Sequence, residues 1–134
     1  MAEFSTKTTK CASFTMIEDG IIHITLFENT EIDLVESKNM QQMSWSLTQG
    51  KPFVAMIDAR VNIEVSKEAR EWGSTPEAQK NMLAQAVLVN SIANKLVGNF
   101  IIKFHKPIAK TRLFSDAPAA LEWLREQKRI ADLK

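Results

Sequence analysis

The sequence is poor in the residues that define several classes of protein. Its 134 residues include one cysteine, two histidines, four glycines, four prolines and no tyrosine. A single cysteine, Cys11, cannot form an internal disulfide, so a reducing compartment is expected. His23 and His105 stand too far apart in the sequence for any familiar metal-ligand spacing. We therefore expect no metal site and no cofactor.

No charge of one sign prevails, and long hydrophobic runs are missing. Seventeen Lys and Arg against sixteen Asp and Glu give a formal net charge of +1, which argues against a protein that wraps nucleic acid. No run approaches the roughly 18 apolar residues of a membrane-spanning helix. The start, Met1 to Phe4, does not resemble a basic leader. We expect a cytoplasmic protein without a transmembrane segment.

The composition that remains is that of an ordinary globular protein. It is 45% hydrophobic and 25% charged, and a chain of this length has room for one compact core. Residues 1–11 are mostly polar and show no period that would bury a face, which predicts a frayed N-terminal tail. The sequence therefore predicts a single domain over residues 12–134.

Strands and helices alternate along this domain. Two β-branched or apolar runs, 12–18 and 21–27, meet at Asp19-Gly20, a preferred hairpin dipeptide. Further strands are expected at 53–57, 84–89 and 111–114. Helices are expected at 32–49 after a cap at Asn29 or Thr30, at 66–72 with a short second piece at 76–81, at 91–104, and after a cap at Asp116. Right-handed crossovers then predict an α/β fold with a mixed sheet of about five strands, an opening antiparallel hairpin followed by parallel strands, and four helices.

Several segments resemble, in order and spacing, the bacterial SpoIIAA-like proteins of the STAS/Sec14-type domain class. They are the Asp19-Gly20 hairpin, 54–60 (VAMIDAR), 65–70 (VSKEAR), 86–89 (AVLV) with 96–100 (LVGNF), and 106–107 (KP) with 112–116 (RLFSD) and 120–124 (ALEWL). Together they span nearly everything after residue 12. The resemblance implies a SpoIIAA/STAS-like fold. We expect a non-enzymatic regulatory or binding module that acts through a protein partner or a small anionic ligand.

The resemblance also points to Ser66. In the anti-sigma antagonist branch of the class, an Asp ends the central strand and is followed by an Asp-Ser-Ser-Gly-Leu type segment, whose Ser is phosphorylated at a helix start. Here Asp58 is followed by Glu64-Val65-Ser66-Lys67, so Ser66 matches in position only. A plain helix cap is therefore the default expectation for Ser66, and phosphorylation is the alternative.

Candidate binding residues gather where ligands sit in open α/β sheets, outside the carboxyl ends of the strands. The candidates at these strand ends and at the helix starts that follow them are Asp58, Arg60, Ser66, Asn90, Ser91 and Lys95. Free amides at the helix starts favour a small anionic ligand at this edge. The simpler alternative is that the serines cap helices and that Arg60 pairs with Asp58.

A second function is lipid or membrane-surface binding through the helix expected at 91–104. Residues 91–112 carry five basic residues and no acid, and an apolar stripe lies behind them. Catalysis has little support, because Cys11 has no nearby histidine and no phosphate-binding glycine loop occurs, so we expect no catalytic residue. A homodimer is compatible with the sequence.

Two further expectations concern single residue types. His23 alternates with Ile22 and Ile24 within a strand, so we expect it on the solvent face or in a local hydrogen bond. The three tryptophans occupy helical positions, where core or interface packing accounts for them.

Overall fold

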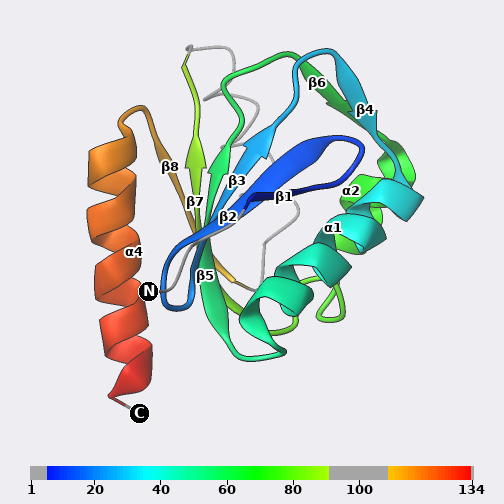
Figure 1. The fold of residues 1–134 in the computed structure, drawn as a ribbon. Helices are drawn as coiled ribbons and strands as arrows, with labels where there is room; N and C mark the ends of the chain where they lie inside the picture. The colour runs from blue at the N-terminus through cyan, green and yellow to red at the C-terminus, as the bar shows by residue number, and fades with distance from the viewer. Residues whose placement is uncertain (1–5, 91–108, 134) are drawn as a thin grey trace.

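The computed structural model describes residues 6–90 and 109–133, which form two sheets and three helices (Figure 1). The main sheet has six strands in the order β1-β2-β3-β5-β7-β8, and β4 pairs with β6 in a separate two-stranded sheet. The strands are β1 Thr6–Thr8, β2 Ala12–Glu18, β3 Ile21–Leu26, β4 Thr30–Ile32, β5 Phe53–Asp58, β6 Ile63–Val65, β7 Met82–Leu88 and β8 Lys110–Phe114. The helices are α1 Leu34–Thr48, α2 Lys67–Gly73 and α4 Ala117–Asp132.

The strand directions confirm an antiparallel opening followed by a parallel core. β1, β2 and β3 are antiparallel neighbours, whereas β3, β5, β7 and β8 run parallel to one another. The expected count of five strands is wrong. The sixth strand, β1, comes from the segment 1–11 that was expected to be a tail. Its threonines show no apolar period because both faces of this edge strand are exposed, and pairing with β2 holds it in place.

The described residues contain three helices instead of four. The helix expected at 91–104 lies outside them. The helical piece expected at 76–81 is wrong, because these residues form turns, and the Gln79 side chain closes the loop by donating from Nε2 to the Gly73 carbonyl at 2.9 Å. The expected cap of α1 is also wrong. Thr30 begins β4, and Asp33 caps the helix by accepting from the Glu36 amide at 2.8 Å.

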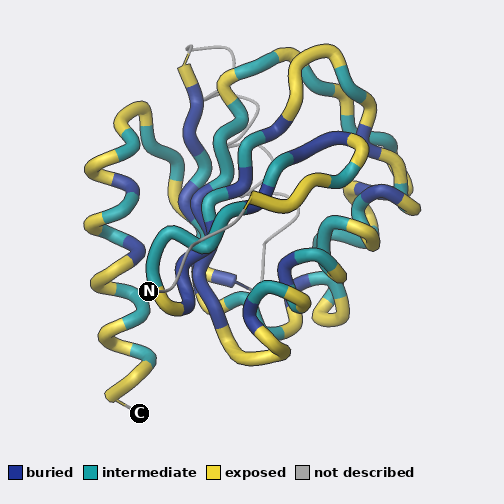
Figure 2. The backbone as a smooth tube through the Cα atoms, viewed as in Figure 1, coloured by how far each residue is buried: buried dark blue, intermediate teal, exposed yellow. Residues whose placement is uncertain are grey.

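The sheet lies between two helical layers, with α1 and α2 on one face and α4 on the other (Figure 1). On the α1 face the core contains Phe14, Ile22 and Phe53, and on the α4 face it contains Val54 and Leu124. Figure 2 shows that buried backbone follows the central strands, while the outer side of α4 is exposed. As expected from its continuous apolar run, β5 is buried on both faces.

A buried carboxylate joins α1 to the turn between β1 and β2. Glu36 lies in the first turn of α1 and is only 4% exposed. Its Oε2 accepts hydrogen bonds from Thr9 Oγ1 and from the Cys11 amide, both at 2.7 Å. These bonds connect the helix start to the edge of the sheet.

Candidate functional site

The carboxyl ends of β5, β7 and β8 lie side by side. In the parallel register Asp58 is opposite Leu88, and Leu88 is opposite Phe114. Two backbone hydrogen bonds continue this alignment past the strand ends, from Ala59 to Leu88 at 3.0 Å and from Val89 to Phe114 at 2.8 Å. The residues that follow these strands therefore share one edge of the sheet, as the sequence predicted.

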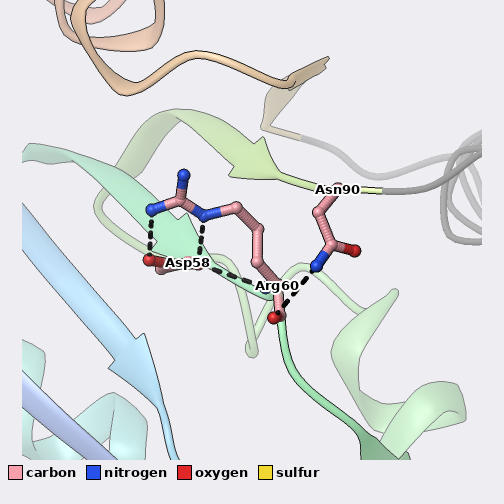
Figure 3. Close-up of polar contacts among 3 residues, drawn as sticks. All are labelled: Asp58, Arg60 and Asn90. Carbon is pink, nitrogen blue, oxygen red and sulfur yellow. Dashed lines mark hydrogen bonds and ion pairs between the residues drawn. The ribbon is translucent and has the colours of Figure 1, made fainter.

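Three of the predicted site residues meet at this edge (Figure 3). The Arg60 guanidinium forms a bidentate ion pair with the Asp58 carboxylate. Nε donates to Oδ1 at 3.0 Å, and Nη2 donates to Oδ2 at 2.8 Å. The Arg60 amide also donates to Oδ1 at 3.1 Å. Asn90 donates from Nδ2 to the Arg60 carbonyl at 3.3 Å. The simpler expectation, that Arg60 pairs with Asp58, is confirmed.

The Asp58–Arg60 pair has no net charge, and its Arg60 guanidinium is an exposed hydrogen-bond donor. The hydrogen bonds from Arg60 lower the pKa of Asp58, and Asp58 raises the pKa of Arg60. The Arg60 side chain is 38% exposed and that of Asp58 is 16% exposed. Among the described residues none accepts a hydrogen bond from Arg60 Nη1. Because the carboxylate neutralises the guanidinium, the pair attracts a free anion weakly, but it holds an exposed hydrogen-bond donor in a fixed position.

His23 is partly buried, so the expectation that it faces solvent is wrong. It lies on β3 opposite Met56 and therefore on the α4 side of the sheet. Its Nε2 is buried, and no residue in the described part of the chain forms a hydrogen bond with it. Burial lowers the pKa of His23, the negative charge of Asp58 opposes this shift, and Arg60 adds to it. The imidazole is therefore neutral at pH 7.

The remaining predicted residues do not join the Asp58–Arg60 pair. Ser66 caps α2, since its Oγ accepts from the Ala69 amide at 3.1 Å, and its own amide donates to Ile32. Asp116 occupies the N-cap position of α4, but its side chain makes no capping hydrogen bond. Ser91 and Lys95 lie outside the described residues.

A cavity on the α1 face of the sheet, opposite to the face that α4 covers, was not predicted from the sequence. It has a volume of about 430 Å³, and the described residues that line it come from the sheet, from helices α1 and α2 and from the segment after α2. Its walls include Ile24 from β3, Met40 and Trp45 from α1, Ile57 from β5 and Trp72 from α2. Trp123 packs instead against Phe114, with ring centroids 5.6 Å apart. Core or interface packing was the expectation for all three tryptophans, and helical spacing alone could not distinguish a residue of a cavity wall from one of the core.

Some polar groups in the cavity wall form hydrogen bonds within the protein, and one does not. Gln79 Oε1 accepts from the Ala109 amide, and Gln85 Nε2 donates to Thr111 Oγ1 at 2.9 Å. Trp72 Nε1, in contrast, is buried and has no hydrogen-bond partner among the described residues. The charged side chains among the described lining residues are both basic, Arg70 and Lys80.

Residues 6–90 and 109–133 contain no group of three or more His, Cys, Asp or Glu arranged to hold a metal ion. Within the same ranges no helix has the length and apolar character needed to cross a membrane.

The comparisons with known proteins bear on family and fold. The family model described as "Domain of unknown function (DUF7793)" matches residues 15–128. A similar solved structure is that of an uncharacterized protein of the DUF3478 family with a SpoIIAA-like fold, from Shewanella loihica PV-4. The two chains are 15% identical and superpose with a TM-score of 0.57, over 91% of this chain and 92% of the other. No curated protein matches the chain. The structural match shows that the fold is SpoIIAA-like.

Proposed function

The chain belongs to the DUF7793 family, and on this premise we propose that it is a non-enzymatic binding module that holds a small, largely apolar ligand. The observation that carries the proposal is the cavity of about 430 Å³ between the sheet and helices α1 and α2. Small-molecule sites typically have volumes of about 300–1,000 Å³, apolar walls and a few polar groups that fix orientation. This cavity has all three properties.

The chemistry around the cavity supports binding more than catalysis. Of the reactive groups considered from the sequence, Cys11, His23 and Asp58 are not among the described lining residues. Burial, reinforced by the negative charge of Glu36, raises the pKa of the Cys11 thiol, which makes it a poor nucleophile. A non-enzymatic role is therefore part of the proposal.

Tryptophan fluorescence offers a direct test. Trp45 and Trp72 line the cavity and Trp123 does not, so a Trp123→Phe background isolates the signal of the cavity. Titration with 1-decanol should change the emission saturably. The Val87→Phe variant, which adds volume to the cavity wall, should weaken binding. Leu83→Phe is the matched control, because Leu83 is exposed on the same strand and does not line the cavity.

Weaker binding by a variant can come from a filled cavity or from partial unfolding, and a stability measurement distinguishes the two. Thermal unfolding should show that both variants remain cooperatively folded. If decanol produces no saturable change, or if Val87→Phe and Leu83→Phe bind it alike, the cavity is not a ligand site. Native mass spectrometry of the purified protein would then be expected to show the bare chain mass.

A second candidate function is docking of a protein partner at the carboxyl edge of the sheet. The observation that favours it is the exposed Arg60 guanidinium, which Asp58 holds in place while Nη1 has no described partner. Cross-linking followed by affinity capture should recover a partner with wild-type protein and lose it with Arg60→Gln. Arg129→Gln, at an exposed ion pair on α4, is the control. Equal capture by both variants would count against this surface.

A further inference from the structure

We propose that the carboxyl edge of the sheet contains a proton-dependent switch, in which His23 takes up a proton and draws the Asp58 carboxylate away from Arg60. The Arg60 guanidinium is then free to bind an acidic group. This inference goes beyond the cavity and does not depend on a ligand there. It concerns the surface of the second candidate function and names the condition, a lowered pH, under which Arg60 becomes available.

His23 and Asp58 lie on the same face of two adjacent strands. In the parallel register of β3 and β5, His23 is opposite Met56 and Thr25 is opposite Asp58. Because side chains alternate along a strand, His23 and Asp58 share the α4 side of the sheet with Met56. A strand spacing of about 4.8 Å and a rise of about 3.3 Å per residue put the Cα atoms of such diagonal neighbours about 8 Å apart. An imidazole and a carboxylate can approach each other across this distance.

The buried nitrogen of His23 makes a proton costly in the present arrangement. Nε2 is buried and forms no hydrogen bond with residues 6–90 or 109–133. A neutral imidazole has one donor and one acceptor nitrogen, whereas the protonated ring donates from both. A buried, charged donor without an acceptor costs more than a neutral group in the same place. Protonation therefore favours a movement that brings an acceptor to His23.

Two charged groups on the page act on His23, and they act in opposite directions. The negative charge of Asp58 raises the pKa of His23, against the effect of burial, and the positive charge of Arg60 lowers it. Asp58 is thus the acceptor that a protonated His23 attracts, and Arg60 is the competitor for it.

The other elements around His23 contribute no comparable charge among the described residues. On the α4 side of the sheet β1 and β2 carry uncharged residues, namely Thr6, Thr8, Ser13, Thr15 and Ile17. At the opposite end of β3, Arg125 of α4 pairs with Glu18, and Lys128 of α4 lies beside Gly20. Neither these groups nor Glu28, in the loop after β3, is among the charges that shift the pKa of His23.

Protonation changes the balance of the Asp58–Arg60 pair. With His23 neutral, Asp58 accepts hydrogen bonds from Nε and Nη2 of Arg60 (Figure 3). A proton on His23 makes the three residues together singly positive, and two cations then compete for one carboxylate. Arg60 is exposed, so water can replace its bonds to Asp58 at little cost, whereas Nε2 of His23 is buried. The carboxylate therefore moves toward His23, and the edge gains a positive charge that attracts an anionic group.

Nitrogen-15 NMR of the Arg60 Nε–H group follows the switch as the pH is lowered from about 8 to about 5. Asp58 stays ionised over this range, because the hydrogen bonds from Arg60 lower its pKa. The Arg60 resonance should shift together with the titration of His23, toward its position in Asp58→Asn. In His23→Gln it should keep its position at neutral pH.

The coupling should also be measurable at His23, since linkage between two sites is reciprocal. Asp58→Asn should lower the pKa of His23, because an attractive charge is lost. Arg60→Gln should raise it, because a repulsive charge is lost and the carboxylate is released. Arg129→Gln is the matched control and should leave it unchanged, since Arg129 forms an exposed ion pair with Glu126 on α4.

Either of two results would overturn the switch. One is an Arg60 resonance that shifts in the same way in the wild type and in His23→Gln. The other is a pKa of His23 that stays at the wild-type value in both Asp58→Asn and Arg60→Gln. This second measurement keeps His23 in place, so it decides the question even where His23→Gln does not fold. Neither measurement uses a ligand of the cavity, so failure of the switch is distinct from failure of the proposed function.

Discussion

Removal of the Glu36 carboxylate tests whether a buried acid holds α1 to the edge of the sheet. Glu36 is 4% exposed, and its Oε2 accepts from Thr9 Oγ1 and from the Cys11 amide at 2.7 Å each. A hydrogen bond to a charged group contributes about 1.5–3 kcal/mol, and truncation would also leave the buried Cys11 N–H without an acceptor. We therefore expect Glu36→Ala to lower the free energy of unfolding by about 3 kcal/mol.

Related variants divide this effect into its parts. Glu36→Gln keeps an oxygen that can accept both bonds but removes the charge, so it should cost about 1 kcal/mol. Thr9→Val removes one donor and should cost a similar amount. Glu31→Ala, at an exposed acid on β4, should change stability by less than about 0.5 kcal/mol.

Urea denaturation gives these free energies, and hydrogen exchange at the Cys11 amide reports the bond directly. Exchange at Cys11 should accelerate in Glu36→Ala by more than the loss of global stability explains. The reasoning is refuted if Glu36→Ala unfolds within about 0.5 kcal/mol of the wild type, or if Cys11 exchange is unchanged.

Three further predictions concern His23, Ser66 and Gly20. Burial lowers the folded-state pKa of His23, so the unfolded chain takes up the proton first. The free energy of unfolding should therefore be constant above about pH 6.5 and decrease as the pH drops toward the folded-state pKa. Urea denaturation from about pH 8 to about pH 5 should show this decrease, and the decrease should be smaller in His23→Gln. Ser66→Ala should cost about 0.5–2 kcal/mol in thermal or urea unfolding, whereas Ser66→Asp should be nearly neutral because both residues cap well; equal losses would contradict the cap. Gly20→Ala should cost more than about 1 kcal/mol, since φ is +78° and the new Cβ would meet Lys128. Gly50→Ala, with φ of +76° and open space, isolates the strain, and equal costs would show that Lys128 simply moves aside.

Much of the fold was predictable because it depends on local patterns. The apolar run 53–57 forms a strand buried on both faces, and Asp19-Gly20 forms the turn of a hairpin, with φ of +78° at Gly20. Strand β1 was missed because an edge strand needs no apolar period, only a neighbour that accepts its hydrogen bonds. The cap of α1 was misplaced because the pairing of β4 with β6 moves the helix start to Asp33.

The candidate site was predictable in part. Because β5 and β7 are parallel neighbours, Asp58, Arg60 and Asn90 had to come to one edge, and hydrogen bonds link all three. The partial burial of His23 was not predictable, because it depends on what covers each face of β3. Trp72 looked like any apolar helical residue, and only the three-dimensional surroundings show that its buried N–H has no acceptor among the described residues.

The sequence by itself therefore determined the opening hairpin, the strands of the parallel core and the residues at its carboxyl edge, since hydrophobic period, turn chemistry and crossover handedness act over short stretches of chain. Only the tertiary structure decided where a cavity is left, which buried donor is unpaired and which carboxylate is buried. These properties depend on how side chains from distant segments fill a common space. Among the described residues, the cavity wall combines Ile24, Trp45, Ile57 and Trp72 from four separate elements, and no pattern within any one of them specifies that they share a cavity.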